Sequence, residues 1–278
     1  MKKLFKSLAV IGLFGALMSP QAIAEEDGPL YATDYDFSFE GIFGTFDRAQ
    51  LQRGFLVYKE VCASCHSLKR VKYRNLGEPG GPEFSKAQVK ALAAEAEVTD
   101  GPNNEGEMFQ RPGQPFDFFV SPFPNDEAAK AGNNGALPPD LSLITKSRSG
   151  WHGTLKSLFT YSLINGTGGP EYVASLLSGY GKEAPEGEEK EGLNYNPYFV
   201  GKWIAMPPPL SEDGVEYADG TKATVEQQAK DVAAFLTWAA EPKMEERKSL
   251  GLFVLLYMAV FTALLYLVKK AIWSNVEH

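Results

Sequence analysis

Apolar residues run without interruption at two places near the ends of the chain, and the first run has the features of an export signal. Residues 8–18 are apolar, three of the first six residues are lysines, and Ala22-Ile23-Ala24 is a small-residue cleavage pattern. A positive start, a short apolar core and small residues at the cleavage point are typical of secretory signals. We therefore expect residues 1–24 to be a cleaved signal peptide.

The second apolar run, residues 249–268, is longer. Its 20 residues carry no charge, and a helix of that length crosses the roughly 30 Å hydrocarbon core of a membrane. The run therefore predicts one transmembrane helix. Together with the signal, it divides the chain into an exported domain at 25–248, on the periplasmic side of the inner membrane, and a cytoplasmic tail at 269–278.

Helical periodicity dominates the region between the two runs. A helix over 47–61 is predicted by an apolar stripe at helical spacing, which consists of Leu51, Phe55, Tyr58 and Cys62. Apolar faces, capping residues and a helix-starting proline predict further helices at 86–97, 126–131, 154–163, 170–179 and 224–240.

Two of these helices begin with a capping-box pattern, Ser85 with Gln88 and Thr224 with Gln227. Alternation typical of strands is rare, and residues 100–150 are rich in Gly, Pro and Asn, which predicts ordered loop. The predicted fold is mainly α with long loops. That is more loop than a core of this size tolerates without further support.

Charge excludes one class of partner. The chain has 27 Lys and Arg against 35 Asp and Glu; without the signal, the span and the tail, 22 basic and 34 acidic residues remain, a net charge of −12. Such a domain repels nucleic acid and attracts basic proteins, although solubility alone also explains it. Two acidic segments are candidate docking faces or solvated loops: Glu95, Glu97, Asp100, Glu105 and Glu107, and Glu183, Glu186, Glu188, Glu189 and Glu191.

The two cysteines of the chain are three residues apart, in Cys62-Ala63-Ser64-Cys65-His66. A disulfide between them would close almost no loop and would stabilise little. Cys-x-x-Cys-His is the attachment pattern of c-type haem. Two thiols at this spacing reach the vinyl groups on one porphyrin edge, and the following His66 offers a ring nitrogen to the iron. A planar covalent cofactor would also supply the apolar core that a loop-rich domain lacks.

Two other interpretations of this motif need partners. A zinc ribbon needs four Cys or His ligands, and the exported domain offers only His152 beyond the motif. A thioredoxin-like redox pair needs a βαβ unit, which the hydrophobic pattern does not indicate. One covalently attached haem c is therefore favoured.

The ligand opposite His66 stays open on the residues alone. Iron in a c-type site takes Met or His there, and the candidates in the exported domain are Met108, Met206, Met244 and His152. Met206 is favoured because Pro207-Pro208-Pro209 stiffens the chain beside it.

Three further residues are candidates for contacts around a haem. Arg148 is a candidate partner for a propionate, with a solvated loop residue as the alternative. The His66 ring needs an acceptor for its other N–H, and a carbonyl of the Pro138-Pro139 loop is a usable one.

Longer stretches of the sequence resemble the cytochrome c1 family, the haem subunits of cytochrome bc1 complexes (quinol–cytochrome c oxidoreductases), of bacterial type. The resemblance is carried by FDRAQLQRGFLVYKEVCASCHSL (46–68), DGPNNEGEMFQRPG (100–113), NNGALPPDLSLITKSR (133–148), NPYFVGKWIAMPPPL (196–210) and the segment 229–251. It implies a c-type cytochrome core with long loop insertions and one C-terminal transmembrane helix. The first and last helices of the exported domain, 47–61 and 224–240, would pack on each other.

The resemblance also implies roles for individual residues. Cys62 and Cys65 would form the thioethers, His66 and Met206 would bind the iron, and Arg148 would lie near a propionate. The family passes single electrons from a Rieske iron–sulfur protein to a soluble c-type cytochrome, next to cytochrome b in the membrane.

This chain would then be an electron-transfer subunit and not an enzyme on its own. Two alternatives are a single-haem subunit of a different respiratory complex, such as a terminal oxidase, and a haem enzyme with an open sixth position.

Overall fold

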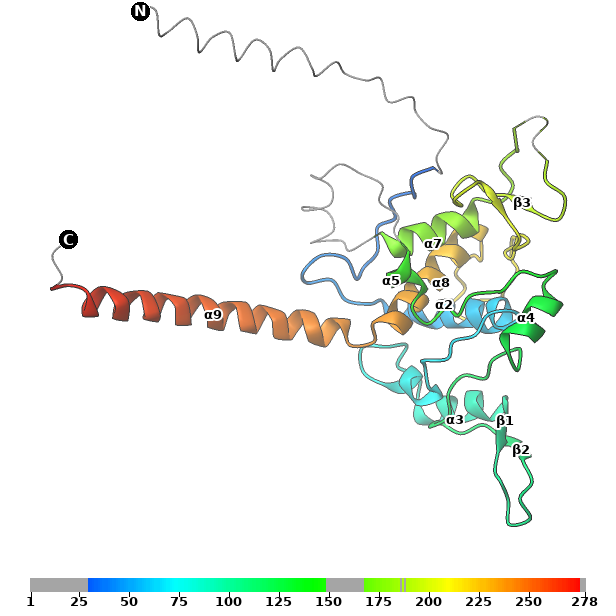
Figure 1. The fold of residues 1–278 in the computed structure, drawn as a ribbon, viewed down its shortest axis with the longest axis horizontal. Coiled ribbons are helices and arrows are strands. Elements are labelled where there is room, and N and C mark those ends of the chain that lie inside the picture. Colours follow the sequence, from blue (N-terminus) through cyan, green and yellow to red (C-terminus); the bar gives the residue numbers. More distant parts are fainter. Residues whose placement is uncertain (1–29, 149–167, 186, 188, 276–278) are drawn as a thin grey trace, which may run out of the picture.

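The computed structural model describes residues 30–148 and 168–275, apart from Glu186 and Glu188. The predicted signal peptide at 1–24, the predicted helix at 154–163 and His152 lie outside the described residues. The described part of the chain is mainly helical, as expected, and forms a head from which one long helix projects (Figure 1).

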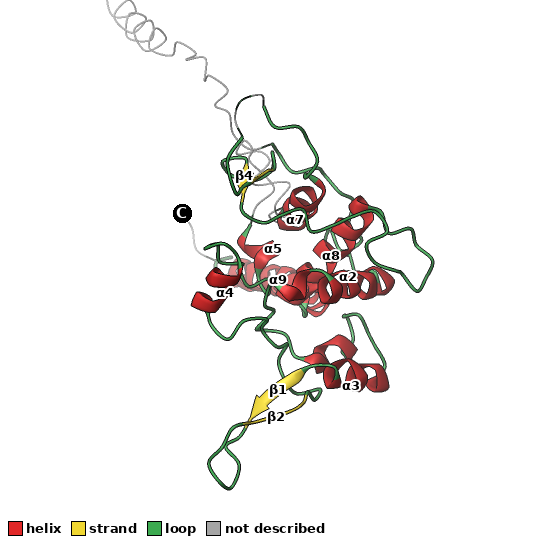
Figure 2. Cartoon of the chain, turned by 90° about the vertical axis from the view of Figure 1, so that its right-hand side faces the viewer, coloured by secondary structure: helices red, strands yellow, loops and turns green. Residues whose placement is uncertain are grey.

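Three helices form the centre of the head, and the last of them packs against the other two. They are α2 (Arg48–Glu60), α7 (Gly169–Ser178) and α8 (Val225–Ala240). Figure 2 shows the three side by side. The predicted packing of the helices at 47–61 and 224–240 on each other is confirmed, and so is the helix predicted at 170–179.

The crossing of α2 and α8 is close because Gly54 lies in it. A Cβ on Gly54 would stand 2.0 Å from the carbonyl oxygen of Asp231, so no other residue fits there. Tyr58, Phe235 and Trp238 are buried next to this crossing. The ring centroids of Tyr58 and Phe235 are 5.8 Å apart, within the range of favourable aromatic pairs.

Side chains at the helix starts satisfy backbone N–H groups that have no partner within the helix. Asp47 accepts hydrogen bonds from the first turn of α2. Thr224 Oγ1 accepts one from Gln227 N at 3.1 Å at the start of α8. The capping box predicted there is only half formed, because Gln227 Nε2 donates to Asp231 instead.

The helix predicted at 86–97 ends earlier than expected. α3 (Lys86–Ala94) has the predicted Ser85–Gln88 capping box, but β1 (Glu97–Asp100) follows it and pairs antiparallel with β2 (Phe109–Pro112). The prediction failed because neither strand alternates clearly in polarity, so no local signal marks the hairpin. It projects from the head at the lower edge of Figures 1 and 2.

Short elements connect the larger ones. They are η2 (Cys62–Ser64), η3 (Tyr73–Gly77), α4 (Asp126–Gly132), α5 (Ile144–Ser147), β3 (Asn194–Tyr195) and β4 (Trp203–Ile204). The turn predicted at 126–131 is confirmed as α4. The loop predicted over 100–150 also contains β2 and α5, which its composition did not indicate.

The long helix is α9 (Met244–Ile272), 29 residues long. It begins before the predicted boundary at 249, and its side chains from Leu250 onwards are largely exposed. Among the described residues it is the one helix that is long and apolar enough to span a membrane.

Two carboxyl groups meet at the start of α7, the buried Glu171 and the half-buried Glu40. Glu171 is 1% exposed. Burial raises its pKa to about 8, and the hydrogen bond with Glu40 adds to the shift. Burial also raises the pKa of Glu40, while its bond to Glu171 opposes the rise. Two carboxyl groups in such contact share a proton, because ionising both at once in a buried place is costly.

Candidate haem-binding site

The two cysteines and His66 lie on one tight turn at the end of α2. The N–H groups of Cys65 and His66 both donate to the carbonyl oxygen of Cys62, at 3.2 and 2.9 Å. Ser64 Oγ ties the turn back to Val61 O at 2.9 Å. Cys62 is half-buried, Cys65 is exposed, and neither forms a disulfide. The stable helix therefore delivers two free thiols and an imidazole within five residues.

Burial controls the protonation of this turn. It raises the pKa of the Cys62 thiol to about 12, and the neighbouring Cys65 adds to the shift. Burial lowers the pKa of His66, while the carbonyl of Pro139 and the charge of Asp140 act in the opposite direction. The imidazole is therefore neutral at pH 7, which is the form that can bind a metal ion.

A hydrogen bond fixes which ring nitrogen of His66 carries the proton. Nδ1 lies 2.8 Å from the carbonyl oxygen of Pro139. Because a carbonyl oxygen only accepts, Nδ1 must donate, and the lone pair is then on Nε2. This arrangement orients a metal-binding histidine and makes its other nitrogen more basic.

Asp140 holds the loop that supplies this carbonyl, and the sequence analysis did not identify it. It accepts hydrogen bonds from Ser67 Oγ at 2.8 Å, Lys69 N at 2.9 Å and Ser142 N at 3.0 Å. Although burial opposes the effect, these bonds hold the pKa of Asp140 below its usual range. The one available signal was that Asp140 directly follows two prolines. It was not sufficient because Asp140 is 74 residues from His66 in the sequence and the two are close only in the folded chain.

A cavity of about 270 Å³ opens beside this turn. Cys65 lines it on one side, and the loop of Pro138, Pro139 and Asp140 lines it on another. Phe123, in the segment before α4, and Ala129, within α4, are part of the remaining wall. The cavity therefore brings Cys65 and the two predicted prolines together.

The Met206 side chain is half-buried and packs against the core from the loop that follows β4. Its backbone is held from two directions. The carbonyl oxygen of Met206 accepts from Tyr180 Oη at 3.1 Å and from Asn194 Nδ2 at 3.3 Å. Neither Tyr180 nor Asn194 was identified from the sequence, because the contacts span 26 and 12 residues.

The other methionine candidates have different surroundings. Met108 is 60% exposed just before β2, on the projecting hairpin. Met244 is 6% exposed and belongs to the core where α9 begins. Of the described candidates, Met206 alone combines a half-buried thioether with a loop held by side chains.

Arg148 is exposed at the end of α5, and its Nη1 lies 3.4 Å from Ser147 O. It is close enough to Tyr172 on α7 to act on that residue: burial raises the pKa of Tyr172, and the Arg148 charge opposes the rise. A role toward a propionate stays a prediction.

The two acidic segments lie far apart on the head. Glu97, Asp100, Glu105 and Glu107 belong to the β1–β2 hairpin and its loop, at the bottom of Figure 1. The described residues of 183–191 form the yellow-green loop before β3, at the top. They cannot form one continuous docking face.

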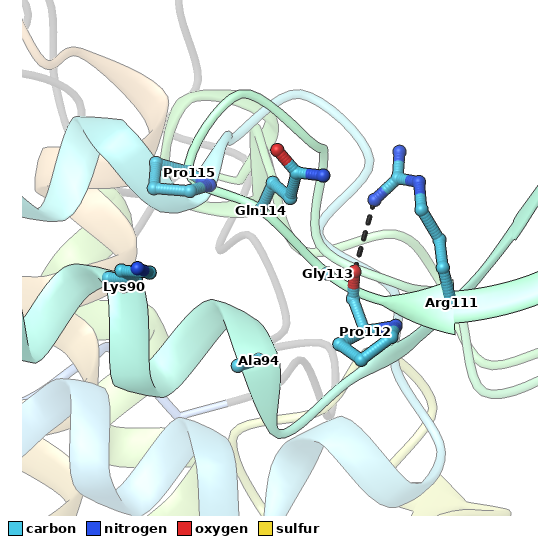
Figure 3. Close-up of a pocket in the computed structure, with 7 residues that line it drawn as sticks. All are labelled: Lys90, Ala94, Arg111, Pro112, Gly113, Gln114 and Pro115. Atoms are coloured by element: carbon cyan, nitrogen blue, oxygen red, sulfur yellow. Dashed lines mark hydrogen bonds between the residues drawn. The ribbon is translucent and has the colours of Figure 1, made fainter.

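A second cavity, of about 350 Å³, lies between α3 and β2 (Figure 3). Its lining contains no Cys, His or Met. Its one guanidinium, that of Arg111, is engaged by Asp100 and by Asp117, the latter at 2.7 Å. This cavity therefore offers none of the ligands that a haem iron takes.

The chain carries the groups that a c-type haem requires. The turn after α2 supplies two unpaired thiols at the attachment spacing and a neutral imidazole with its Nε2 lone pair available, and the loop after β4 supplies a half-buried thioether.

Comparisons with known proteins agree with the site. The model of the Cytochrome C1 family matches residues 37–276. The chain is 46% identical to cytochrome c1 of Rhodospirillum rubrum over 273 residues, which cover 92% of this chain and 93% of that protein. It is 44% identical to cytochrome c1 of Cereibacter sphaeroides over 283 residues, which cover 94% and 93%.

A longer relative, the cytochrome b/c1 of Bradyrhizobium diazoefficiens, is 50% identical over 262 residues; these cover 94% of this chain but 38% of that protein. The chain therefore belongs to the cytochrome c1 family, whose members are c-type haem proteins.

Proposed function

We propose that this chain relays single electrons within a quinol–cytochrome c oxidoreductase, from a Rieske iron–sulfur protein to a soluble c-type cytochrome. The observation that carries the proposal is the turn at the end of α2, where Cys62, Cys65 and the tautomer-fixed His66 lie together. The choice of complex is supported by membership of the cytochrome c1 family, whose members are haem subunits of bc1 complexes. When bound, the haem supplies a one-electron redox couple.

The residues proposed to hold the haem determine whether it transfers electrons or binds a substrate. Cys62 and Cys65 would hold a bound haem through thioether bonds, and His66 Nε2 and the Met206 sulfur would bind its iron. Two side-chain ligands would leave the iron no site for a substrate, so the group would supply electron transfer and not catalysis at the metal. Pro139 orients the His66 ring, Pro138 lines the cavity beside the turn, and Arg148 would balance a propionate charge.

We infer the following topology. Residues 1–24 are a cleaved signal, 25–248 form the periplasmic haem domain, 249–268 cross the inner membrane and 269–278 lie in the cytoplasm. The arrangement of the head supports this, because α4 and β3, which flank the proposed site, lie on the side of the head away from α9 (Figure 1). A haem held there would be on the aqueous side, within reach of mobile partners.

Cytochrome b is the proposed partner of α9 within the membrane. The net charge of −12 supports a basic electron acceptor, which would dock on the hairpin or on the 183–191 loop. Reversing charge on one segment at a time tests which one docks. Charge reversal should make the electron-transfer rate less dependent on ionic strength only when it is made in the segment that docks the acceptor.

The function is tested by purifying the assembly from membranes through a tag on this chain. We expect a b-type cytochrome and a Rieske protein to copurify, and quinol to reduce a soluble cytochrome c through the haem of this chain. Copurification with a terminal oxidase would overturn the assignment to this complex. Binding of carbon monoxide by the unmodified haem would overturn the closed coordination and favour an enzyme.

A further inference from the structure

Two adjacent apolar side chains are exposed on the face of the head nearest to α9. Ile42 is 65% exposed and Phe43 is 76% exposed. Single exposed apolar residues are common on protein surfaces, but two neighbours this exposed on one loop tip call for a partner. The tip, Gly41 to Gly44, carries no charge.

The loop that presents these side chains has a defined conformation. Thr45 N donates to Ser38 O at 3.1 Å and closes its base. Gly41 has a positive φ of 70°, and a Cβ on Gly44 would stand 1.9 Å from the carbonyl oxygen of Glu40. The left-handed backbone at Gly41 favours glycine, and the close approach at Gly44 leaves no room for a side chain.

Three buried phenyl rings lie under the loop. Phe37 and Phe39 stack with their ring centroids 4.9 Å apart, and Phe39 lies 5.1 Å from Phe46. The exposed fractions of the three side chains are 6% or less. The apolar tip is therefore a fixed projection from the core.

Polar contacts fasten this loop to the first turns of α9. Lys248 Nζ donates to the carbonyl oxygens of Phe39 and Gly44. Glu245 Oε1 accepts from Phe46 N at 2.8 Å, and its carboxylate forms a two-bond pair with Arg48 at 2.7 and 2.8 Å. Lys248 is also the last charge before the apolar run of 249–268. The loop base is thus fixed at the level where α9 enters the hydrocarbon, and the loop (blue in Figure 1) projects beside these turns.

We propose that Ile42 and Phe43 insert into the interface of the bilayer that α9 crosses, as a second membrane contact of the head. The partner is the lipid headgroup–acyl boundary, where aromatic and aliphatic side chains without charge are favoured. A helix alone is a single pivot about which the head can tilt. A second contact beside it restricts that tilt. The proposal rests on the membrane anchoring by α9 proposed above.

Spin labels on the full-length haem-loaded chain in lipid nanodiscs test this contact. A nitroxide on Phe43→Cys is compared with labels on two equally exposed apolar residues: Val200→Cys, 70% exposed beyond β3, and Leu255→Cys, 68% exposed within α9. Accessibility to oxygen, which concentrates in lipid, and to a water-soluble nickel chelate is measured by power saturation with the haem reduced. An unchanged haem spectrum shows that each variant is folded.

We expect the label at 43 to resemble the label at 255, with at least a threefold higher ratio of oxygen to nickel accessibility than the label at 200. If the label at 43 behaves like the label at 200 while that at 255 is in lipid, the interfacial contact is refuted and the anchoring stands. A water-accessible label at 255 would refute the anchoring itself. A label at 43 shielded from both reagents would mean that protein covers the loop, which also overturns the proposal.

Discussion

The two thiols and the backbone of His66 lie on a local turn that follows α2, whereas Met206 lies in a loop whose backbone carbonyl is held by side chains 12 and 26 residues away. The ring of His66 is itself oriented by the carbonyl of Pro139, 73 residues away. The thiols of the proposed site are therefore placed by local structure, while the orientation of both proposed iron ligands depends on contacts between distant parts of the chain.

The largest expected effect concerns the local side. Replacing Cys62 and Cys65 together by Ala should abolish covalent haem and reduce the amount of folded chain at least tenfold, because a cofactor bound only by the folded state stabilises that state. Haem staining of the denatured band and an immunoblot after protease treatment measure the two effects. Ser64→Ala, on the same turn, is the matched control and should keep the haem. Normal amounts of protease-resistant double variant would show that folding does not depend on the cofactor.

The next effect concerns the distant side. Met206→Leu should keep covalent haem, because both thiols remain, but lose the sixth ligand. The haem should become high-spin and bind carbon monoxide, and its reduction potential should fall by on the order of 0.1 V, within the roughly 0.8 V over which axial ligands act. Absorption spectra and a redox titration measure this. Met108→Leu, at an exposed methionine, is the control and should change neither the spectrum nor the reduction potential. If the haem of Met206→Leu stays low-spin, Met206 is not the ligand.

The same contrast explains what the sequence could predict. The stripe of Leu51, Phe55 and Tyr58 and the motif that follows them are local patterns, so α2 and the position of the thiols were predictable. The cap at Thr224 and the helix behind it were predictable for the same reason.

Contacts between distant residues left weaker signals. The β1–β2 hairpin was missed because its pairing depends on residues across a loop, and its strands lack regular alternation. Asp140, Tyr180 and Asn194 were missed because their hydrogen bonds join distant segments. In the sequence, a polar residue that holds a loop by hydrogen bonds cannot be told from a polar residue exposed to solvent.

Two carboxyl groups of the head should also respond oppositely to pH. The raised pKa of Glu171, at the start of α7 beside Glu40, means that the folded state binds more protons than the unfolded state between its ordinary value of 4.5 and about 8. Stability from this group is fully present below pH 4.5 and is lost as pH rises through about 8. A glutamine side chain is neutral at every pH, so Glu171→Gln should reduce the loss of stability as pH rises.

Melting temperatures of the purified assembly at pH 5.5, 7 and 8.5 measure this slope. The native chain should melt several degrees lower at pH 8.5 than at 5.5, and Glu171→Gln should remove most of that difference. Glu183→Gln, at an exposed carboxylate on the acidic loop, should leave it intact. If the melting temperature depends on pH equally in the native chain and in Glu171→Gln, the pH dependence comes from a group other than Glu171.

On the His66 side, Asp140 has a lowered pKa. Its stabilisation is present above its ordinary value of 3.8 and is lost as pH falls through the lower folded value. Asp140→Asn weakens three hydrogen bonds to a charged acceptor and should cost about 2 kcal/mol at pH 7. The difference from the native chain should shrink toward pH 3.

Denaturant unfolding at pH 7 and pH 3.5 measures that difference. Asp126→Asn, an exposed acid that lines the same cavity, should cost only a few tenths of a kcal/mol. An equal loss for Asp140→Asn at both pH values would contradict a role for its charge.

The smallest effect should come from the side chains that hold the Met206 loop. Tyr180→Phe removes one hydroxyl donor from the Met206 carbonyl, worth about 1 kcal/mol. Because the other donor, Asn194, remains, the haem should stay low-spin at 25 °C. On heating, it should lose the low-spin spectrum at a lower temperature than the native chain, before the head unfolds. Tyr195→Phe, on β3 opposite Trp203, is the control. If Tyr180→Phe lowers the unfolding and spin-state temperatures together, the hydroxyl stabilises the head as a whole and does not act selectively on the methionine loop.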